Sequence, residues 1–438
     1  MLAMSKFRPL ALLAVTVAAC ASDPAQVVHD TSKNPGYHVV GNQVLDKNGA
    51  VHYFHGVDRP SLEWSAGGDH LSAGDFRLMA SWKANVVRIA LNQDYWLFGD
   101  GAKGYQTTVL QTVEWAKQAG MDVILDLHWS DKGSQGTVAP AQQQMADANS
   151  LTFWQQVAAF YKDDGRVLFE LYNEPHDISW DVWLGGGSAG DFNAVGMQQL
   201  YDAVRATGAQ NLVIAGGLDW AFDLSGVATH PLQGTNIMYA THPYSNQNWK
   251  PVSSFDQKWG YLTATAPVIV TEFGDNDSAL ACATDYSSAV IGYADRAGAH
   301  WTSWAWWVGG CSFPSLITDW AGTPSAPGQV VKDALARYAT QGMPITQDGG
   351  IVQPARDAGA PELPPVLTPD SRIDVPGRID GAGGVDLTTA VDLAAAIDVS
   401  ATIDLPLAID LSMPNDLPIA VDIAAIDTAT AEAGRGID

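Results

Sequence analysis

The segment MDVILDLH, residues 121–128, is a short and almost continuously apolar run that ends in a histidine. The segment VLFELYNEP, residues 167–175, follows the same pattern and ends in an asparagine, a glutamate and a proline. Apolar runs of this length without alternation are typical of strands buried on both faces of a parallel sheet. A longer amphipathic stretch at 150–163 lies between them and predicts a helix. The two segments therefore indicate a strand–helix–strand unit of an α/β protein.

The same unit recurs along residues 37–343. Further strands are expected at 53–57, 85–91, 211–217, 237–242, 267–273 and 301–307. Further helices are expected at 72–83, 105–118, 191–207, 285–297 and 328–340. Eight strands that alternate with helices predict a (β/α)8 TIM barrel. A doubly wound sheet is the alternative, but no glycine-rich phosphate fingerprint follows the first strand.

A hairpin is expected ahead of the barrel. The segment HVVGNQVLDKNGAVHYF, residues 38–54, holds two strand-like runs on either side of Asp46-Lys47-Asn48-Gly49, which is a turn sequence.

Charge divides the chain into two parts. The whole chain of 438 residues has a formal net charge of −25, which argues against nucleic acid and anionic lipid surfaces as partners. Residues 1–344 carry 19 basic and 32 acidic groups, whereas residues 345–438 carry 4 and 16. All 16 tryptophans lie between Trp64 and Trp320, and the tail at 344–438 has no aromatic residue. All of the tryptophans therefore lie within the predicted barrel.

The first 20 residues have the pattern of an export signal. Two basic residues precede an apolar run, 9–19, that is too short to span a bilayer as a mature helix. The end of the run, Val17-Ala18-Ala19-Cys20, resembles the lipobox of bacterial lipoproteins, which implies lipidation at Cys20 and a linker at 21–36. Ala21 after the cysteine points to the outer membrane or cell surface. Ordinary cleavage, which would leave a free secreted protein, is the alternative.

The tail at 344–438 repeats with a period of six. Aspartates recur at this spacing from Asp374 to Asp422, mostly between aliphatic residues, and several prolines interrupt the repeat. A period of six fits no helix. A disordered, self-repelling spacer is the favoured interpretation, and a small β-solenoid of hexapeptide turns is the alternative.

Two cysteines, Cys282 and Cys311, remain in the exported part of the chain. An oxidising compartment favours a disulfide between them. Two separate buried thiols are the alternative.

Polar residues end several predicted strands. His128, Asn173 with Glu174, His242 with Tyr244, and Glu272 each stand at or just after a strand's carboxyl end. In a (β/α)8 barrel these ends meet on one face, where the chemistry of the fold is found. Two carboxylates brought together from different strands can act as acid and nucleophile in glycoside hydrolysis.

At Leu171-Tyr172-Asn173-Glu174-Pro175 and Thr271-Glu272-Phe273-Gly274 the sequence closely resembles glycoside hydrolase family 5, the cellulase family of retaining (β/α)8 barrels. The resemblance covers about residues 37–343. It implies that Glu174 is the general acid/base and Glu272 the nucleophile. The retaining mechanism requires carboxyl groups about 5–5.5 Å apart, and we expect the pKa of Glu174 to be raised relative to that of Glu272.

The resemblance also implies a set of substrate-binding residues. Arg88 would keep Glu272 ionised, His128 and Asn173 would bind sugar hydroxyls, and His242 and Tyr244 would lie beside the two glutamates.

Two tryptophans complete this set. Alternation along 301–307 would place Trp304 and Trp306 on one face, and Trp304 aligns with the family's sugar platform. The segment 57–64 departs from the endoglucanase pattern, which leaves the choice of substrate in doubt.

These features predict a retaining endo-β-1,4-glucanase that acts on a β-linked polysaccharide. The alternatives are a β-mannanase or other β-glycanase of the same family, and a non-catalytic glycan-binding surface lipoprotein. No cofactor is expected, and no metal, because zinc-site spacings such as His-x-x-x-His are missing. We expect a monomer that contacts the membrane only through the lipid anchor.

Overall fold

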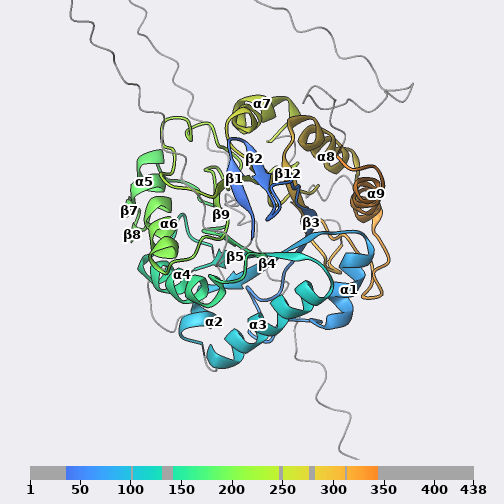
Figure 1. Cartoon of the computed structure of the whole chain (residues 1–438), viewed down its shortest axis with the longest axis horizontal. Coiled ribbons are helices and arrows are strands. Elements are labelled where there is room, and N and C mark those ends of the chain that lie inside the picture. Colours follow the sequence, from blue (N-terminus) through green and yellow to red (C-terminus); the bar gives the residue numbers. More distant parts are fainter. Residues whose placement is uncertain are drawn as a thin grey trace, which may run out of the picture. The chain divides into compact units, whose positions relative to one another are not determined.

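The computed structural model of the chain describes residues 36–99, 102–130, 142–245, 250–275, 282–310 and 313–343. At its centre is a closed barrel of eight parallel strands (Figure 1). In barrel order the strands are β10 (Ile237–Thr241), β11 (Val268–Val270), β12 (His300–Ser303), β3 (His55–Arg59), β4 (Val86–Asn92), β5 (Asp122–Trp129), β6 (Val167–Glu170) and β9 (Val213–Gly216). The predicted (β/α)8 barrel is confirmed, all eight expected strands are present, and the doubly wound alternative is wrong.

Helices surround the barrel (Figure 1). They are α1 (Ala73–Ser81), α2 (Gln93–Leu97), α3 (Ala102–Gln118), α4 (Ala148–Tyr161), α5 (Trp180–Gly185), α6 (Met197–Ala206), α7 (Phe255–Lys258), α8 (Asp285–Ala297) and α9 (Ala326–Gln341), with 3-10 turns η2 (Val252–Ser254) and η3 (Gly260–Ala264). Side chains of Ser72, Asp147 and Ser325 accept backbone N–H groups at the starts of α1, α4 and α9. These caps satisfy donors that have no partner within the helix, and so they set where each helix begins.

The expected helix at 191–207 is wrong over its first turns. Residues there form a small hairpin of β7 (Gly187–Ala189) and β8 (Phe192–Ala194), and α6 begins only at Met197. The start of α6 is set by Gln199, whose side chain accepts the backbone N–H of Gly196.

Alternation along the strands separates two cores. Outward-facing strand residues pack against the helices. Inward-facing residues fill the barrel near the amino-terminal ends of the strands, and they include Val86, Ile124, Leu168 and Ile269. Two residues further along the same strands stand Arg88, Asp126, Glu170 and Thr271, all fully buried. The barrel interior is therefore apolar at one end and charged at the other.

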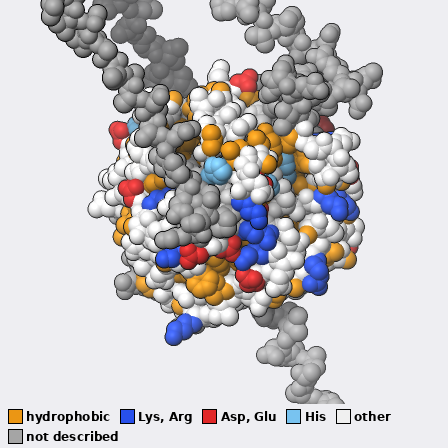
Figure 2. All heavy atoms as spheres, viewed as in Figure 1, with side chains coloured by type: hydrophobic (Ala, Val, Ile, Leu, Met, Phe, Trp, Pro, Cys, Tyr) orange, Lys and Arg blue, Asp and Glu red, His pale blue; other side chains and the backbone are white. Residues whose placement is uncertain are grey.

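The hairpin of β1 (His38–Val40) and β2 (Gln43–Leu45) closes the apolar end. Tyr37 and Val39 pack against the inner core, and the Tyr37 hydroxyl donates to Asp122 at the start of β5. Figure 2 shows this face of the molecule, on which apolar and charged side chains are intermixed. The site must therefore lie at the opposite, charged end.

The hairpin differs from the predicted one in its turn. β1 and β2 reverse at Gly41, which has a φ of +61°, one turn before Asp46-Lys47-Asn48-Gly49. The predicted turn also forms, because Asp46 accepts the backbone N–H groups of Asn48 and Ala50, but it joins β2 only to an isolated bridge at Val51.

Several predictions fall on other parts of the chain. The export signal, Cys20, the linker, Cys311 and the repeat tail lie outside the described residues and stay predictions. Cys282 is disulfide-bonded, so it is not a free thiol. Among the described helices, none combines the length and the apolar character that a membrane span requires.

Candidate active site

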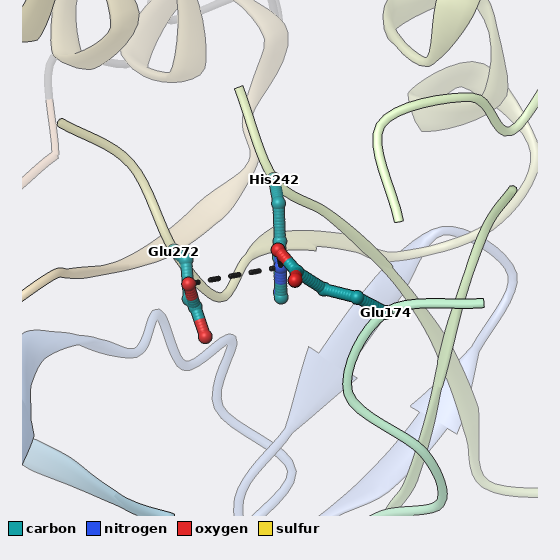
Figure 3. A group of neighbouring side chains, drawn as sticks. All are labelled: Glu174, His242 and Glu272. Atoms are coloured by element: carbon teal, nitrogen blue, oxygen red, sulfur yellow. Dashed lines mark hydrogen bonds and ion pairs between the residues drawn. The ribbon is translucent and has the colours of Figure 1, made fainter. Parts of the chain in front are cut away.

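The charged end of the barrel brings together polar side chains from five strands or the residues just after them. Arg88 comes from β4, His128 from β5, His242 follows β10, and Glu272 follows β11. Glu174 lies four residues beyond the end of β6. The predicted strand ends therefore converge on one site, as Figure 3 shows for three of them.

Arg88 lies at the centre of this site and contacts three of its acidic side chains. Its guanidinium donates to Glu170, Glu272 and Asn173, each at 2.6 Å, and lies 2.9 Å from Asp126. The side chain is completely buried, and burial opposes its charge, but the surrounding carboxylates raise the pKa of Arg88 well above its usual value. Arg88 is thus a permanent cation that balances the acidic groups around it.

Glu272 is held between two donors. Arg88 donates to Oε1 and the Tyr244 hydroxyl to Oε2, both at 2.6 Å. Both carboxylate oxygens of Glu272 thus accept a hydrogen bond, which fixes the orientation of the side chain that would act as nucleophile.

The second glutamate lies close to the first. One carboxylate oxygen of Glu174 and one of Glu272 are within 4.8 Å of each other. Glu174 is 9% exposed and Glu272 4%, so both are accessible from the barrel mouth while largely shielded from water. This distance fits retaining glycosidases, in which the carboxyl groups are about 5–5.5 Å apart, better than inverting ones, in which they are about 6.5–9.5 Å apart.

His242 and Glu174 share a proton. The hydroxyl of Thr271 donates to Glu170, so it must accept from His242 Nε2, which lies 2.9 Å away. His242 Nε2 therefore carries a hydrogen, and Nδ1 faces Glu174 Oε1 at 2.9 Å with one proton between them. The pair can place that proton on the imidazole or on the carboxyl group.

The charges around the pair favour the imidazole of His242 as the holder of this proton. Burial alone would lower the pKa of His242, but Glu272, Glu170 and Glu174 raise it to about 10. Burial alone would raise the pKa of Glu174, but the hydrogen bond and charge of His242 and the charge of Lys250 lower it to about 2. The expectation of a raised Glu174 pKa is therefore wrong, because the sequence analysis placed His242 beside the glutamates without its positive charge and did not include Lys250.

The arrangement of these residues agrees with a comparison of the sequence with known families. The family model described as "Cellulase (glycosyl hydrolase family 5)" matches residues 45–310, more than half of the chain. The chain belongs to the cellulase family, glycosyl hydrolase family 5.

Curated relatives carry the names of endoglucanases. An endoglucanase of Clostridium saccharobutylicum is 25% identical over 270 residues, which cover 61% of this chain and 56% of that protein. A manganese-dependent endoglucanase of Phanerodontia chrysosporium is 30% identical over 220 residues, which cover 45% and 54%. The chain thus spans about half the length of the curated relatives it matches.

Solved structures share the fold. A β-glucanase of Saccharophagus degradans superposes with a TM-score of 0.58 at 23% identity, covering 69% of this chain and 93% of that one.

The sugar-facing side of this family 5 site is built around His128. Its Nδ1 lies 2.7 Å from Asp126, which orients the ring, and its ring stacks on Trp304 at 5.4 Å and 11°. The Asn173 amide nitrogen lies 3.5 Å from His128 Nε2 and donates to Gln142. Every predicted binding residue except Trp306 thus contacts the two glutamates or a direct neighbour of theirs.

The prediction that Trp306 binds substrate is wrong. Trp306 is completely buried, packs edge-on against Trp82, and donates its indole N–H to Asp75 of α1 at 2.7 Å. The predicted alternation does not apply because β12 ends at Ser303, before either tryptophan. Trp306 therefore belongs to the layer between barrel and helices, and Trp304 alone stays beside the site.

Charged residues of this family 5 site that escaped the prediction include Asp126, Glu170 and Lys250. Asp126 and Glu170 lie beneath the glutamates on β5 and β6, and both are completely buried. Each is a charge inside an otherwise apolar strand run, a signal that could have identified them. Lys250 is 2% exposed and lies 5.3 Å from the Phe222 ring, and no such pattern in the sequence marks it.

Glu174, His242 and Glu272 also have the spacing of a metal site, with ligand atoms within 4.8 Å (Figure 3). A metal would bind His242 through an unprotonated nitrogen. Both ring nitrogens already have hydrogen-bond partners and the pKa of His242 is raised to about 10, so a metal would have to displace a firmly held proton. The donor set fits a cationic histidine better than a metal ligand.

Proposed function

We propose that this family 5 member is a retaining endo-β-1,4-glucanase that hydrolyses β-linked glucan. The observation that carries the proposal is the pair Glu174 and Glu272, with oxygens within 4.8 Å at the carboxyl ends of barrel strands. The endoglucanase names of the curated relatives support the substrate class.

The reaction follows from the partners of the two glutamates. Glu272, oriented by Arg88 and Tyr244, attacks the anomeric carbon and forms a covalent glycosyl–enzyme bond as the glycosidic oxygen leaves. Glu174 delivers to that oxygen the proton that it shares with His242. A water then gives a proton back to Glu174 and attacks the same carbon, which releases Glu272 and restores the original configuration.

The binding of substrate assists the proton transfer. A sugar that fills the mouth of the barrel removes water from Glu174. Loss of water acts against the effect of His242 and Lys250, because burial by itself raises the pKa of this carboxyl group. The shared proton is thereby shifted from His242 towards Glu174 at the moment it is needed.

The test is the activity of Glu272→Ala on carboxymethylcellulose, barley β-glucan and mannan. We expect the release of reducing sugar from the glucans to fall at least about 10³-fold, because the nucleophile is gone. Glu114→Ala, which removes an exposed glutamate of α3, is the matched control and should keep full activity. Wild-type rates for Glu272→Ala would overturn the proposal, and a preference of the unmodified enzyme for mannan would replace β-glucanase by β-mannanase.

We also propose that the reaction needs no metal, although one relative is named as manganese-dependent. Dialysis against EDTA should leave the rate on barley β-glucan unchanged. A loss of activity that manganese restores would show instead that a metal binds at or near Glu174, His242 and Glu272.

We further propose that the enzyme is exported and anchored to lipid at Cys20. The lipobox-like end of the apolar run supports this. Cys20→Ser should abolish labelling by radioactive palmitate and release the enzyme from the membrane fraction. Unchanged labelling would contradict the anchor.

A further inference from the structure

A further carboxyl group lies at the charged end of the barrel, and the proposed reaction does not use it. Asp58 is the fourth residue of β3 and is paired in register with Arg88 of β4. Its neighbour Val57 packs against the helices, so alternation along the strand directs Asp58 into the barrel. Asp58 is 1% exposed and lies close enough to Glu170 and Glu272 for their charges to act on it. Asp58 is therefore buried in the same charged layer as Arg88.

The carboxyl groups of this layer differ in their hydrogen bonds. Glu170 accepts from Arg88 at 2.6 Å and from Thr271 at 2.7 Å, and Glu272 likewise has a donor on each oxygen. In the part of the chain that the structure describes, no donor at hydrogen-bonding geometry faces either oxygen of Asp58. Arg88 directs its Nε, Nη1 and Nη2 groups to other side chains. Asp58 thus lacks the partners that a buried charge requires.

An ionised Asp58 would be unfavourable at this position. A buried charge without hydrogen bonds loses its hydration without compensation, and such a group takes up a proton instead. Burial has the largest effect on Asp58; Arg88 opposes it, Glu272 and Glu170 add to it, and the pKa of this carboxyl group is raised well above its usual value. The missing partners and the neighbouring charges both favour the protonated acid.

The hydroxyl group beside Asp58 is suited to accept that proton. Thr302 of β12 is a neighbour of Asp58 and donates its own hydrogen to the backbone carbonyl of Thr271 at 2.7 Å. Thr302 can therefore accept from Asp58 but not donate to it. Tyr244, another neighbour, donates its hydrogen to Glu272. A hydrogen bond between Asp58 and Thr302 thus requires the proton to be on Asp58.

We propose that Asp58 is held as the uncharged carboxylic acid and is a positioning residue for the nucleophile Glu272. An ionised Asp58, paired in register with Arg88, would compete with Glu272 for the guanidinium. The uncharged group fills the space beside Arg88 without attracting it, so that Arg88 stays 2.6 Å from Glu272 Oε1. The inference rests on the proposed role of Glu272 and adds the condition that the neighbouring acid keeps its proton.

The pH dependence of stability tests the proton. Above about pH 4 an aspartate is ionised in the unfolded chain, whereas Asp58 stays protonated in the fold, so rising pH destabilises the unmodified enzyme. Asp58→Asn keeps the shape and has no proton to lose. In urea unfolding, the unfolding constant of the unmodified enzyme should therefore rise relative to that of Asp58→Asn, by up to about tenfold for each pH unit between about pH 4 and 7. A ratio that is constant or falls with pH would show an ionised Asp58 and overturn the proposal.

Glu170→Gln gives the contrast within the same layer. Burial opposes the charge of Glu170, but Arg88 and His242 lower the pKa of this carboxyl group. Its ionised form therefore stabilises the fold above pH 4.5, and this contribution is lost as the pH falls. Glu170→Gln should accordingly be less stable than the unmodified enzyme at pH 7, where Asp58→Asn should be more stable.

Activity tests the positioning. Asp58→Ala leaves a gap beside Arg88 and should lower kcat on barley β-glucan about tenfold at unchanged KM, because the guanidinium is free to turn away from Glu272. Asp58→Asn should restore kcat to within about twofold, since its amide group can donate to Thr302 as the protonated acid does. Glu114→Ala serves again as the control. Full activity of Asp58→Ala, or a loss in Asp58→Asn as large as that in Asp58→Ala, would overturn the positioning role.

The two measurements separate this inference from the proposed function. If the unmodified enzyme cleaves no β-glucan, the proposed function and the positioning role fail together, and urea unfolding still decides whether Asp58 carries a proton. If the enzyme is active but Asp58→Asn shows no growing advantage in stability as the pH rises, only this inference fails.

Discussion

At the scale of single residues, one shared proton determines how the site responds to pH. Glu174 has its pKa lowered from 4.5 to about 2, so its ionised form stabilises the fold above pH 4.5, and this contribution is lost as the pH falls towards 2. His242 has its pKa raised from 6.5 to about 10, so its contribution is complete below pH 6.5 and is lost as the pH rises towards 10. The pair therefore stabilises the enzyme fully only between pH 4.5 and 6.5.

Urea unfolding of His242→Gln checks this prediction. The loss in the free energy of unfolding relative to the unmodified enzyme should be largest between pH 4.5 and 6.5 and smaller at pH 3 and pH 9.5. His230→Gln removes a half-buried partner of the exposed Asp181 and should change the stability by less than about 1 kcal/mol. A loss for His242→Gln that is the same at every pH would contradict the shared proton.

Substitution of the buried Arg88 should lower the free energy of unfolding far more than substitution of a partly exposed arginine. Arg88→Met leaves Glu170, Glu272 and Asp126 buried without their cation, and we expect the free energy of unfolding to fall by about 3–5 kcal/mol. Arg166→Met breaks a pair with Asp122 in which the arginine is 41% exposed, and should cost about 0–1 kcal/mol. Chemical denaturation of both variants measures the contrast, and equal losses would contradict it.

Residue types at strand ends made the catalytic pair predictable, but not its electrostatics. Glu174 and Glu272 stand in short motifs that the sequence displays directly. The cation beside Glu174 depends on Thr271, which fixes the hydrogen on His242 Nε2 through contacts between residues 29 and 101 positions apart. No local pattern records such contacts.

At the scale of elements, the existence of each barrel strand was predictable from the sequence, whereas the residue at which a strand ends was not always. All eight barrel strands were predictable because a strand buried on both faces is apolar throughout. The end of β12 was not, since Trp304-Ala305-Trp306-Trp307 continues the apolar run after the strand has ended at Ser303. The misassigned Trp306 follows from that hidden boundary.

Close packing between neighbouring strands gives a prediction at this scale. A Cβ added at Gly56 of β3 would lie 1.8 Å from the carbonyl oxygen of Val86 in β4. Gly56→Ala must push the two strands apart, and we expect it to lower the free energy of unfolding by about 1–3 kcal/mol or more. Gly104→Ala, in α3 with nothing within 4 Å of the added carbon, should be neutral or stabilising by up to about 1 kcal/mol. Thermal unfolding of the two variants checks this, and a neutral Gly56→Ala would contradict the packing.

At the scale of the whole molecule, chemistry belongs to one part of the chain. Every residue of the proposed catalytic site lies between Arg88 and Trp304, and the repeat tail at 344–438 supplies none of them. Deletion of 345–438 should therefore leave kcat/KM on cellohexaose and the melting temperature of the barrel within experimental error. Lost activity would make the tail part of the enzyme, and loss of cell association alone would make it an attachment element.

The stereochemistry of the product tests the two-glutamate mechanism most directly. Proton NMR of the first products released from cellohexaose reports the configuration at the new reducing end before mutarotation. With the oxygens of Glu174 and Glu272 within 4.8 Å of each other, the initial product should be the β-anomer. An initial α-anomer would mean inversion by a water between the carboxylates, and would contradict the covalent role of Glu272.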